Sequence, residues 1–388
     1  MSMMKRVACV VAALTMVGAL AAVNLSASGA STKATAKPAV TMTTPGSQWT
    51  VKHPFKAAFI YVGAPSDAGW THAHDVGRLE VQKYFGGRVV TMFKSDVPEG
   101  PQCAQVITEL VNAGANIVFA TSYGYQTQLL QASKKYPKVL FEQATGTSVT
   151  KTLGEYYGAG EDADYLGGMA AGAAALAAGN NKIGFVAPFP IPECLREVDA
   201  FTLGAQAMDP KATVQVVWTN TWFGPSTERT AAQSLVDAKV SVLADGQDSP
   251  TTGQVAKAAG LKWVGYDSNQ QSFAPNSWLT GTTYNWGPYY IMEIKAAMAG
   301  TWKSAFWYGS LADGFVQLAP FGKSVSAATK TAVLAKEHAM IKGSFDPFTG
   351  PIKGQNGKIV VKAGVTLNVM QKYSISWFVK GVVGNPKG

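Results

Sequence analysis

The stretch "KAAFIYVGAPSDAGWTHAHDVGRLEVQKYFGGRVVTMF", residues 56–93, decides the fold. It holds an apolar run at 56–63, a helical pattern at 74–85 and a second apolar run at 88–93. Short runs that are apolar on both faces are typical of buried parallel strands. A helix between two such runs predicts a βαβ crossover, and therefore an α/β fold.

The same alternation continues along the chain and then restarts near residue 180. Strand patterns recur at 116–122, 138–144, 182–189, 213–220, 240–247, 262–268 and 278–286. Helical patterns recur at 102–114, 126–137, 163–179, 193–208, 226–239, 252–260 and 289–300. The helix at 163–179 is rich in Gly and Ala, which predicts close packing. Two doubly wound, Rossmann-like lobes are expected, joined by several strand connections that form a hinge around a cleft.

Composition shifts divide the chain further. We expect a signal peptide at 1–30, a flexible leader at 31–54, a first lobe at 55–178 with a return over about 282–312, and a second lobe at 179–281 with a return over about 313–380.

The N-terminus has the pattern of an export signal. Lys5 and Arg6 precede the apolar run "VACVVAALTMVGALAAV", and small residues follow it. The run is short for a membrane anchor, which is the alternative reading, because a span needs about 20 residues. We therefore expect a periplasmic or otherwise extracytoplasmic protein. Export permits a disulfide, but Cys103 and Cys194 fall in different lobes and are expected to be unpaired.

In an open parallel sheet, ligands bind beyond the carboxyl ends of the strands. The corresponding segments here carry aromatic, amide and carboxylate residues among Gly and Pro, and few cations: "APSDAGW", "TSYGYQ", "QATG", "APFPIP", "NTWFGP", "DGQDSP", "GYDSNQQ" and "YNWGP". This set favours a flat, largely uncharged ligand with hydrogen-bonding edges, such as a heteroaromatic ring. Each aromatic face stacked on such a ring contributes about 1–3 kcal/mol.

Trp70 and Trp222 are the candidates for the two stacking faces, because each follows a strand and they lie in different lobes. The alternative is that each fills the core of its own lobe. Asp267 is the candidate carboxylate for the ligand edge, or else a helix N-cap. Further candidates for polar contacts are Asn220, Tyr123, Gln247 and Asn285.

Signatures of catalysis, metal binding and nucleic-acid binding are weak. The sequence has no G-x-S-x-G motif, and no further ligands complete a zinc site around His72 and His74. The net charge of +9 is spread out, which argues against nucleic acid. We expect no enzyme, no cofactor and no metal. An exported nucleoside hydrolase is the alternative, but the carboxylates that it would need look isolated in sequence: Asp67, Asp75, Asp248 and Asp267.

The order of these motifs resembles the basic-membrane-protein (BMP) family of ABC-importer substrate-binding proteins. The resemblance covers roughly residues 55–345 and rests on "DAGWTHAHDVGR", "TSYGY", "VAPFPIPE", "VVWTNTWFGPSTER" and "GYDS". It implies a type I periplasmic-binding fold, a purine ligand and a membrane permease as partner, with the protein itself a monomer. It also implies that Trp70 and Trp222 hold the purine while Asp267 holds the base edge.

One departure from the family bears on the ligand. Nucleoside-binding members carry an acidic residue in a "DG" pair after the fourth strand, where this chain has Thr145 and Gly146. The resemblance therefore implies a free base of the adenine, hypoxanthine or guanine type, unless Glu142 compensates. A purine nucleoside or another small cyclic metabolite remains the alternative. The sensory core of a transcription regulator shares the fold, but the export signal and the lack of a DNA-binding module argue against it.

Overall fold

The structure is a computed structural model that describes residues 48–388. All of these residues fall within one compact unit. The predicted signal peptide and the leader up to residue 47 lie outside the described residues. Within 48–388, the structure contains no helix both long and apolar enough to cross a bilayer.

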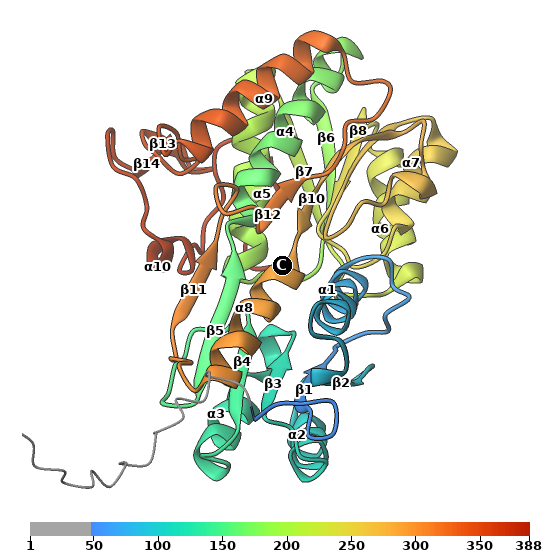
Figure 1. Cartoon of the computed structure of the whole chain (residues 1–388). Coiled ribbons are helices and arrows are strands. Elements are labelled where there is room, and N and C mark those ends of the chain that lie inside the picture. The colour runs from blue at the N-terminus through green and yellow to red at the C-terminus, as the bar shows by residue number, and fades with distance from the viewer. Residues whose placement is uncertain (1–47) are drawn as a thin grey trace, which may run out of the picture. The chain divides into compact units, whose positions relative to one another are not determined.

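The first lobe is built on a six-stranded sheet in which every neighbouring pair is parallel (Figure 1). Its strands, in spatial order, are β11 (Phe306–Gly309), β5 (Leu153–Gly158), β4 (Leu140–Ala144), β3 (Ile117–Ala120), β1 (Phe55–Ile60) and β2 (Val89–Lys94). β1 is apolar on both faces, as predicted. Ala58 and Ile60 pack with the cluster of α2 and α3, while Phe59 packs with that of α1 and α8.

The second lobe has a seven-stranded sheet that is parallel except for one edge pair, β10 with β12. Its strands, in spatial order, are β12 (Val316–Leu318), β10 (Trp278–Tyr284), β9 (Lys262–Gly265), β8 (Val242–Asp245), β6 (Lys182–Ala187), β7 (Thr213–Trp218) and β15 (Val382–Val383). A separate hairpin pairs β13 (Ile352–Lys353) with β14 (Ile359–Val361).

Helices connect the strands of both sheets. They are α1 (Trp70–Phe85), α2 (Pro101–Asn112), α3 (Gln126–Lys135), α4 (Gly160–Ala177), α5 (Pro192–Met208), α6 (Pro225–Asp237), α7 (Thr251–Ala259), α8 (Trp286–Ala299), α9 (Ala327–Ile341) and α10 (Val369–Lys372). Short 3-10 turns lie at η1 (Gly86–Arg88), η2 (Tyr123–Tyr125) and η3 (Gln271–Phe273).

The chain crosses between the two sheets at three places: from β5 to β6, from β10 to β11, and from β11 to β12. Several connections at one side of two lobes form a hinge, because they permit rotation of the lobes without their separation. The α/β class and the two-lobed architecture predicted from the sequence are confirmed.

The predicted close packing of the Gly/Ala-rich helix is also confirmed. A Cβ built on Gly168 in α4 would lie 2.0 Å from the carbonyl oxygen of Phe201 in α5, and one on Gly204 would lie 1.9 Å from that of Tyr165. Side chains at these positions would force the two helices apart.

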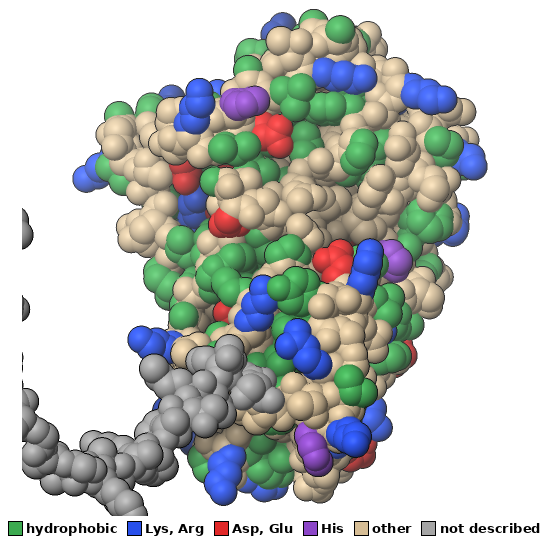
Figure 2. All heavy atoms as spheres, in the orientation of Figure 1, with side chains coloured by type: hydrophobic (Ala, Val, Ile, Leu, Met, Phe, Trp, Pro, Cys, Tyr) green, Lys and Arg blue, Asp and Glu red, His purple; other side chains and the backbone are tan. Residues whose placement is uncertain are grey.

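Other details differ from the sequence interpretation. β5 was not predicted, because "LGEYYG" carries Gly and a charge, yet it is buried along its whole length. Helix α1 begins at Trp70, four residues before the predicted start. Cys103 and Cys194 are free and buried, as expected. Lys and Arg side chains are scattered over the face in Figure 2, in keeping with the spread charge of the sequence.

Candidate functional site

A cavity with about 370 Å³ of empty space lies between the two lobes. The first lobe lines it with Val62, Trp70, Ser122, Tyr123 and Thr145, and the second lobe lines it with Glu193, Glu197, Trp222, Gly246, Asp248 and Tyr266. Most of these residues follow the carboxyl ends of strands, where the parallel topology places binding sites.

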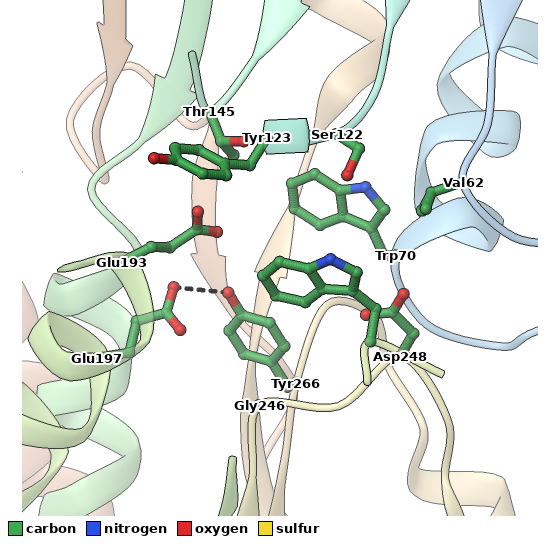
Figure 3. Close-up of a pocket in the computed structure, with 11 residues that line it drawn as sticks. Val62, Trp70, Ser122, Tyr123, Thr145, Glu193, Glu197, Gly246, Asp248 and Tyr266 are labelled. Atoms are coloured by element: carbon green, nitrogen blue, oxygen red, sulfur yellow. Dashed lines mark hydrogen bonds between the residues drawn. The ribbon is translucent and has the colours of Figure 1, made fainter. Parts of the chain in front are cut away.

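Trp70 is the first residue of α1 and is only 7% exposed. Its indole N–H donates to the carbonyl oxygen of Thr121 (2.7 Å). The rings of His74 and Trp286 pack edge-on against it, with centroid distances of 4.5 and 5.2 Å. These contacts fix the indole at the wall of the cavity (Figure 3).

Trp222 lies in the loop after β7 and is partly buried. Its ring meets Phe189 edge-on at 5.0 Å, and its carbonyl oxygen accepts from the backbone N–H of Asp248 (3.1 Å). The two tryptophans thus come from opposite lobes and line the same cavity.

The lobes are closed on each other beside this cavity. The carbonyl oxygen of Ala68 accepts from the Ser268 hydroxyl (2.6 Å) and from the Gln270 amide (3.1 Å). Gly69 presses on the main chain of Asp248, because a Cβ at Gly69 would lie 2.1 Å from the Asp248 carbonyl oxygen. Closure therefore depends on the absence of a side chain at residue 69.

The second lobe presents two glutamates, Glu193 and Glu197, from adjacent turns of α5 (Figure 3). Glu197 accepts from the hydroxyls of Tyr266 (2.7 Å) and Tyr157 (3.0 Å). Burial raises the pKa of Glu197 to about 6. Burial and the neighbouring Glu197 raise the pKa of Glu193 to about 8, while Arg196 opposes the shift.

Three aspartates meet where the lobes touch. Burial raises the pKa of both Asp248 and Asp267 well above the usual range, and the Asp248 carboxyl further raises the pKa of Asp267. Asp67, which accepts from the backbone N–H groups of Gly69, Thr71 and His72, contributes to both shifts. The sequence interpretation that these carboxylates are isolated is therefore wrong, because loops after different strands converge at one edge of the sheets.

The candidates from the sequence are only partly brought together. Trp70, Trp222 and Tyr123 line the cavity. Asp267 and Asn285 instead line an adjacent groove with about 870 Å³ of empty space. Asp267 is 1% exposed, and neither of its carboxylate oxygens has a hydrogen-bond partner among residues 48–388.

The two remaining candidates lie in the loops around β7 and β8. Asn220 is exposed and has a φ of +56°. Gln247 is buried, and its amide donates to the hydroxyl of Thr219 (2.9 Å). Neither side chain is among those that line the cavity.

His72 and His74 lie on helix α1 and not on a strand. His74 is fully buried, stacks on Trp286 at 3.9 Å, and shares a hydrogen bond with the Tyr290 hydroxyl (2.5 Å). Among residues 48–388 no cluster of three or more His, Cys, Asp or Glu side chains could hold a metal ion.

Sequence reasoning missed Glu193, Glu197, Asp248 and Tyr266 as lining residues. Glu193 directly follows "APFPIP", the segment at the carboxyl end of β6. Extending the search beyond this strand end by one helical turn would have found both glutamates. The sequence indicates Tyr266 less clearly as a lining residue, because an aromatic residue at the end of an apolar strand is typical of the core.

Thr145 lines the cavity. Its hydroxyl has no hydrogen-bond partner among the described residues. Glu142 accepts from the Tyr289 hydroxyl (3.0 Å) and the Trp302 indole (2.8 Å) and does not line the cavity.

Comparison with known proteins gives a consistent assignment. Residues 55–345 match the Bmp family, described as ABC transporter substrate-binding protein PnrA-like. A purine-binding protein of Brucella abortus is 37% identical over 84% of this chain and 92% of its own length. A putative ABC-transporter glucose-binding protein of Haloferax volcanii is 30% identical over 84% of this chain and 80% of its own length.

Solved structures share the fold at low identity. An ABC-transporter solute-binding protein from Conexibacter woesei has a TM-score of 0.62 at 20% identity, covering 75% of this chain and 98% of that one. A transcriptional activator of the comK gene from Bacillus halodurans has a TM-score of 0.65 at 22% identity, covering 76% and 99%.

Proposed function

Because this chain belongs to the Bmp family of ABC transporter substrate-binding proteins, we propose that it binds a purine nucleobase outside the cytoplasm and delivers it, as a monomer, to a membrane permease. The two indoles stack on the faces of the base, and polar groups around the cavity hold its edges. No bond is made or broken.

The observation that carries this proposal is the pair of tryptophans, Trp70 and Trp222, which reach one enclosed cavity from opposite lobes. Lobe closure over a flat ring buries both of its faces at once. The purine-binding relative from Brucella abortus supports a purine as the ligand. The lining residues include no Lys, Arg or His, which disfavours phosphorylated ligands.

Two observations favour a free base over a nucleoside as the proposed ligand. The position after β4 that would grip ribose hydroxyls is Thr145, and Glu142 is engaged elsewhere. Asp267, which lines the adjacent groove, remains the proposed partner of the base edge, and Asn220, Gln247 and Asn285 are the proposed secondary contacts.

Titration calorimetry tests the proposal with adenine, hypoxanthine, adenosine and glucose. We expect binding of a nucleobase tighter than about 100 μM, equivalent to roughly −5.5 kcal/mol. Glucose is the essential comparison because of the relative from Haloferax volcanii. Binding of glucose but of no purine would contradict the proposal.

A hydrolase is the rival function, and the convergence of Asp67, Asp248 and Asp267 gives it a specific basis. Incubation with adenosine or inosine, followed by chromatography for released base, separates the two functions. We expect no release, whereas turnover would favour the hydrolase.

A further inference from the structure

The cavity brings two acidic side chains together without a cation. Glu193 and Glu197 are one helical turn apart on α5, and both line the cavity. The five ion pairs formed within residues 48–388 include neither of them. Arg196, which lies between them in sequence, is bonded to Glu161 (3.1 Å). Two carboxylates that face one enclosed space cannot both ionise cheaply.

The two glutamates have different surroundings. Glu197 is 3% exposed, and one of its oxygens, Oε1, accepts from two tyrosine hydroxyls. These bonds stabilise an ionised Glu197 and hold Tyr266 in place. The carboxyl of Glu193 points from α5 into the space between Tyr123 and Trp70 (Figure 3). Of the two groups, Glu193 is therefore the one placed to meet a ligand.

Other charged or titratable groups around Glu193 do not neutralise it. On α5, Glu197 raises the pKa of Glu193 and Arg196 lowers it. Tyr157, on β5, also lowers this pKa through a hydrogen bond. Glu99, in the loop before α2, raises the pKa of Glu193. Glu193 in turn raises the pKa of Asp248, which follows β8, and that of Tyr373, which follows α10. Arg196 is the only cation among these groups, and it offsets only part of the rise in the pKa of Glu193 that burial, Glu197 and Glu99 cause.

We propose that Glu193 binds the ligand as a neutral carboxylic acid, so that its O–H donates to one ring-edge atom while its C=O accepts from the adjacent N–H. The ligand class is a neutral heterocycle with a hydrogen-bond donor beside an acceptor, a pattern present on both amino- and oxo-purines. This inference rests on the proposed function and deepens it. Glu193 is then the specificity-determining residue, and Glu197 is a positioning residue that holds Tyr266.

The linkage between protonation of Glu193 and ligand binding determines whether affinity rises or falls with pH. In an open cleft Glu193 would be solvated and its pKa would be that of an ordinary glutamate, whereas burial on closure raises that pKa, so closure on the ligand would take up a proton. Affinity should then be highest in mild acid and fall as pH rises toward the raised pKa. One linked proton corresponds to about a tenfold loss of affinity per pH unit.

Calorimetry with adenine from about pH 6 to about pH 8 measures this slope. Glu193→Gln keeps one donor and one acceptor without titrating, so it should retain binding and reduce the slope by about one unit. Glu193→Ala should bind at least tenfold more weakly than Glu193→Gln. The matched control is Glu109→Gln, which removes an exposed glutamate paired with Lys94 (3.0 Å), and it should behave as wild type.

A second measurement uses the unmodified protein. Binding enthalpies in two buffers of different ionisation enthalpy should show proton uptake at pH 7, which does not depend on any variant folding. Adenine binding with no proton uptake, or with the same slope in Glu193→Gln, would overturn the inference. Failure of every purine to bind the wild-type protein would instead overturn the proposed function.

Discussion

Replacement of Gly69 by alanine tests how much lobe closure contributes to ligand affinity. The new Cβ would lie 2.1 Å from the carbonyl oxygen and 2.7 Å from the Cα of Asp248, where ordinary contact starts at 3.4 Å. The Asp248 main chain cannot rotate away as a side chain would, so the lobes must stay apart by about the missing 1.3 Å. Overpacking of this kind costs about 1–3 kcal/mol.

This cost falls on the closed state alone. Gly69→Ala should therefore weaken adenine binding by roughly 5- to 140-fold in calorimetry. Its melting temperature without ligand should change little, because each lobe keeps its own core. Small-angle scattering with saturating adenine should show a larger radius of gyration than wild type.

The control is Gly63→Ala in the same loop. A Cβ there would meet only its own lobe, at 3.1 Å from the Thr71 hydroxyl and 3.6 Å from the Asp67 carboxylate. It should bind adenine within a few fold of wild type. Wild-type affinity in Gly69→Ala would refute the reasoning that this contact governs closure.

Two further predictions concern stacking and stability. Trp70→Ala and Trp222→Ala should each lose about 1–3 kcal/mol of adenine affinity in calorimetry, which is the contribution of one stacked face; unchanged affinity in either would remove that indole from the site. Lys372→Met should lower the free energy of unfolding by about 1–3 kcal/mol in a denaturant titration, because it removes one buried partner of Glu161 (3.0 Å) while Arg196 (3.1 Å) remains. The exposed Lys323→Met is its control, and equal stabilities of the two variants would contradict the assigned role of the buried pair.

Much of the fold could be read from the sequence because burial on both faces leaves a local pattern. β1 and the Gly/Ala-rich α4 are examples, since each contains a run of apolar or small residues that is typical of buried, closely packed segments. β5 could not be read, because the isolated run "LGEYYG" looks polar and its burial depends on β4 and β11 on either side.

For the candidate site, too, some residues could be predicted from the sequence and others could not. The rule that ligands bind beyond the carboxyl ends of parallel strands identified Trp70 and Trp222 as candidates, because this rule depends only on the topology of the sheets. It did not show that Asp248 lies close enough to Asp267 to affect its pKa, or that Glu197 is held by Tyr157 and Tyr266, because these relations arise from loops and helices that are brought together only by the tertiary fold.

A crystal structure of the mature chain grown with adenine tests the central claim most directly. The account predicts a purine ring between the indoles of Trp70 and Trp222, with the Glu193 carboxyl at hydrogen-bond distance from its edge. A ring bound in the groove beside Asn285, or a cleft in which either indole contacts only its own lobe, would contradict it.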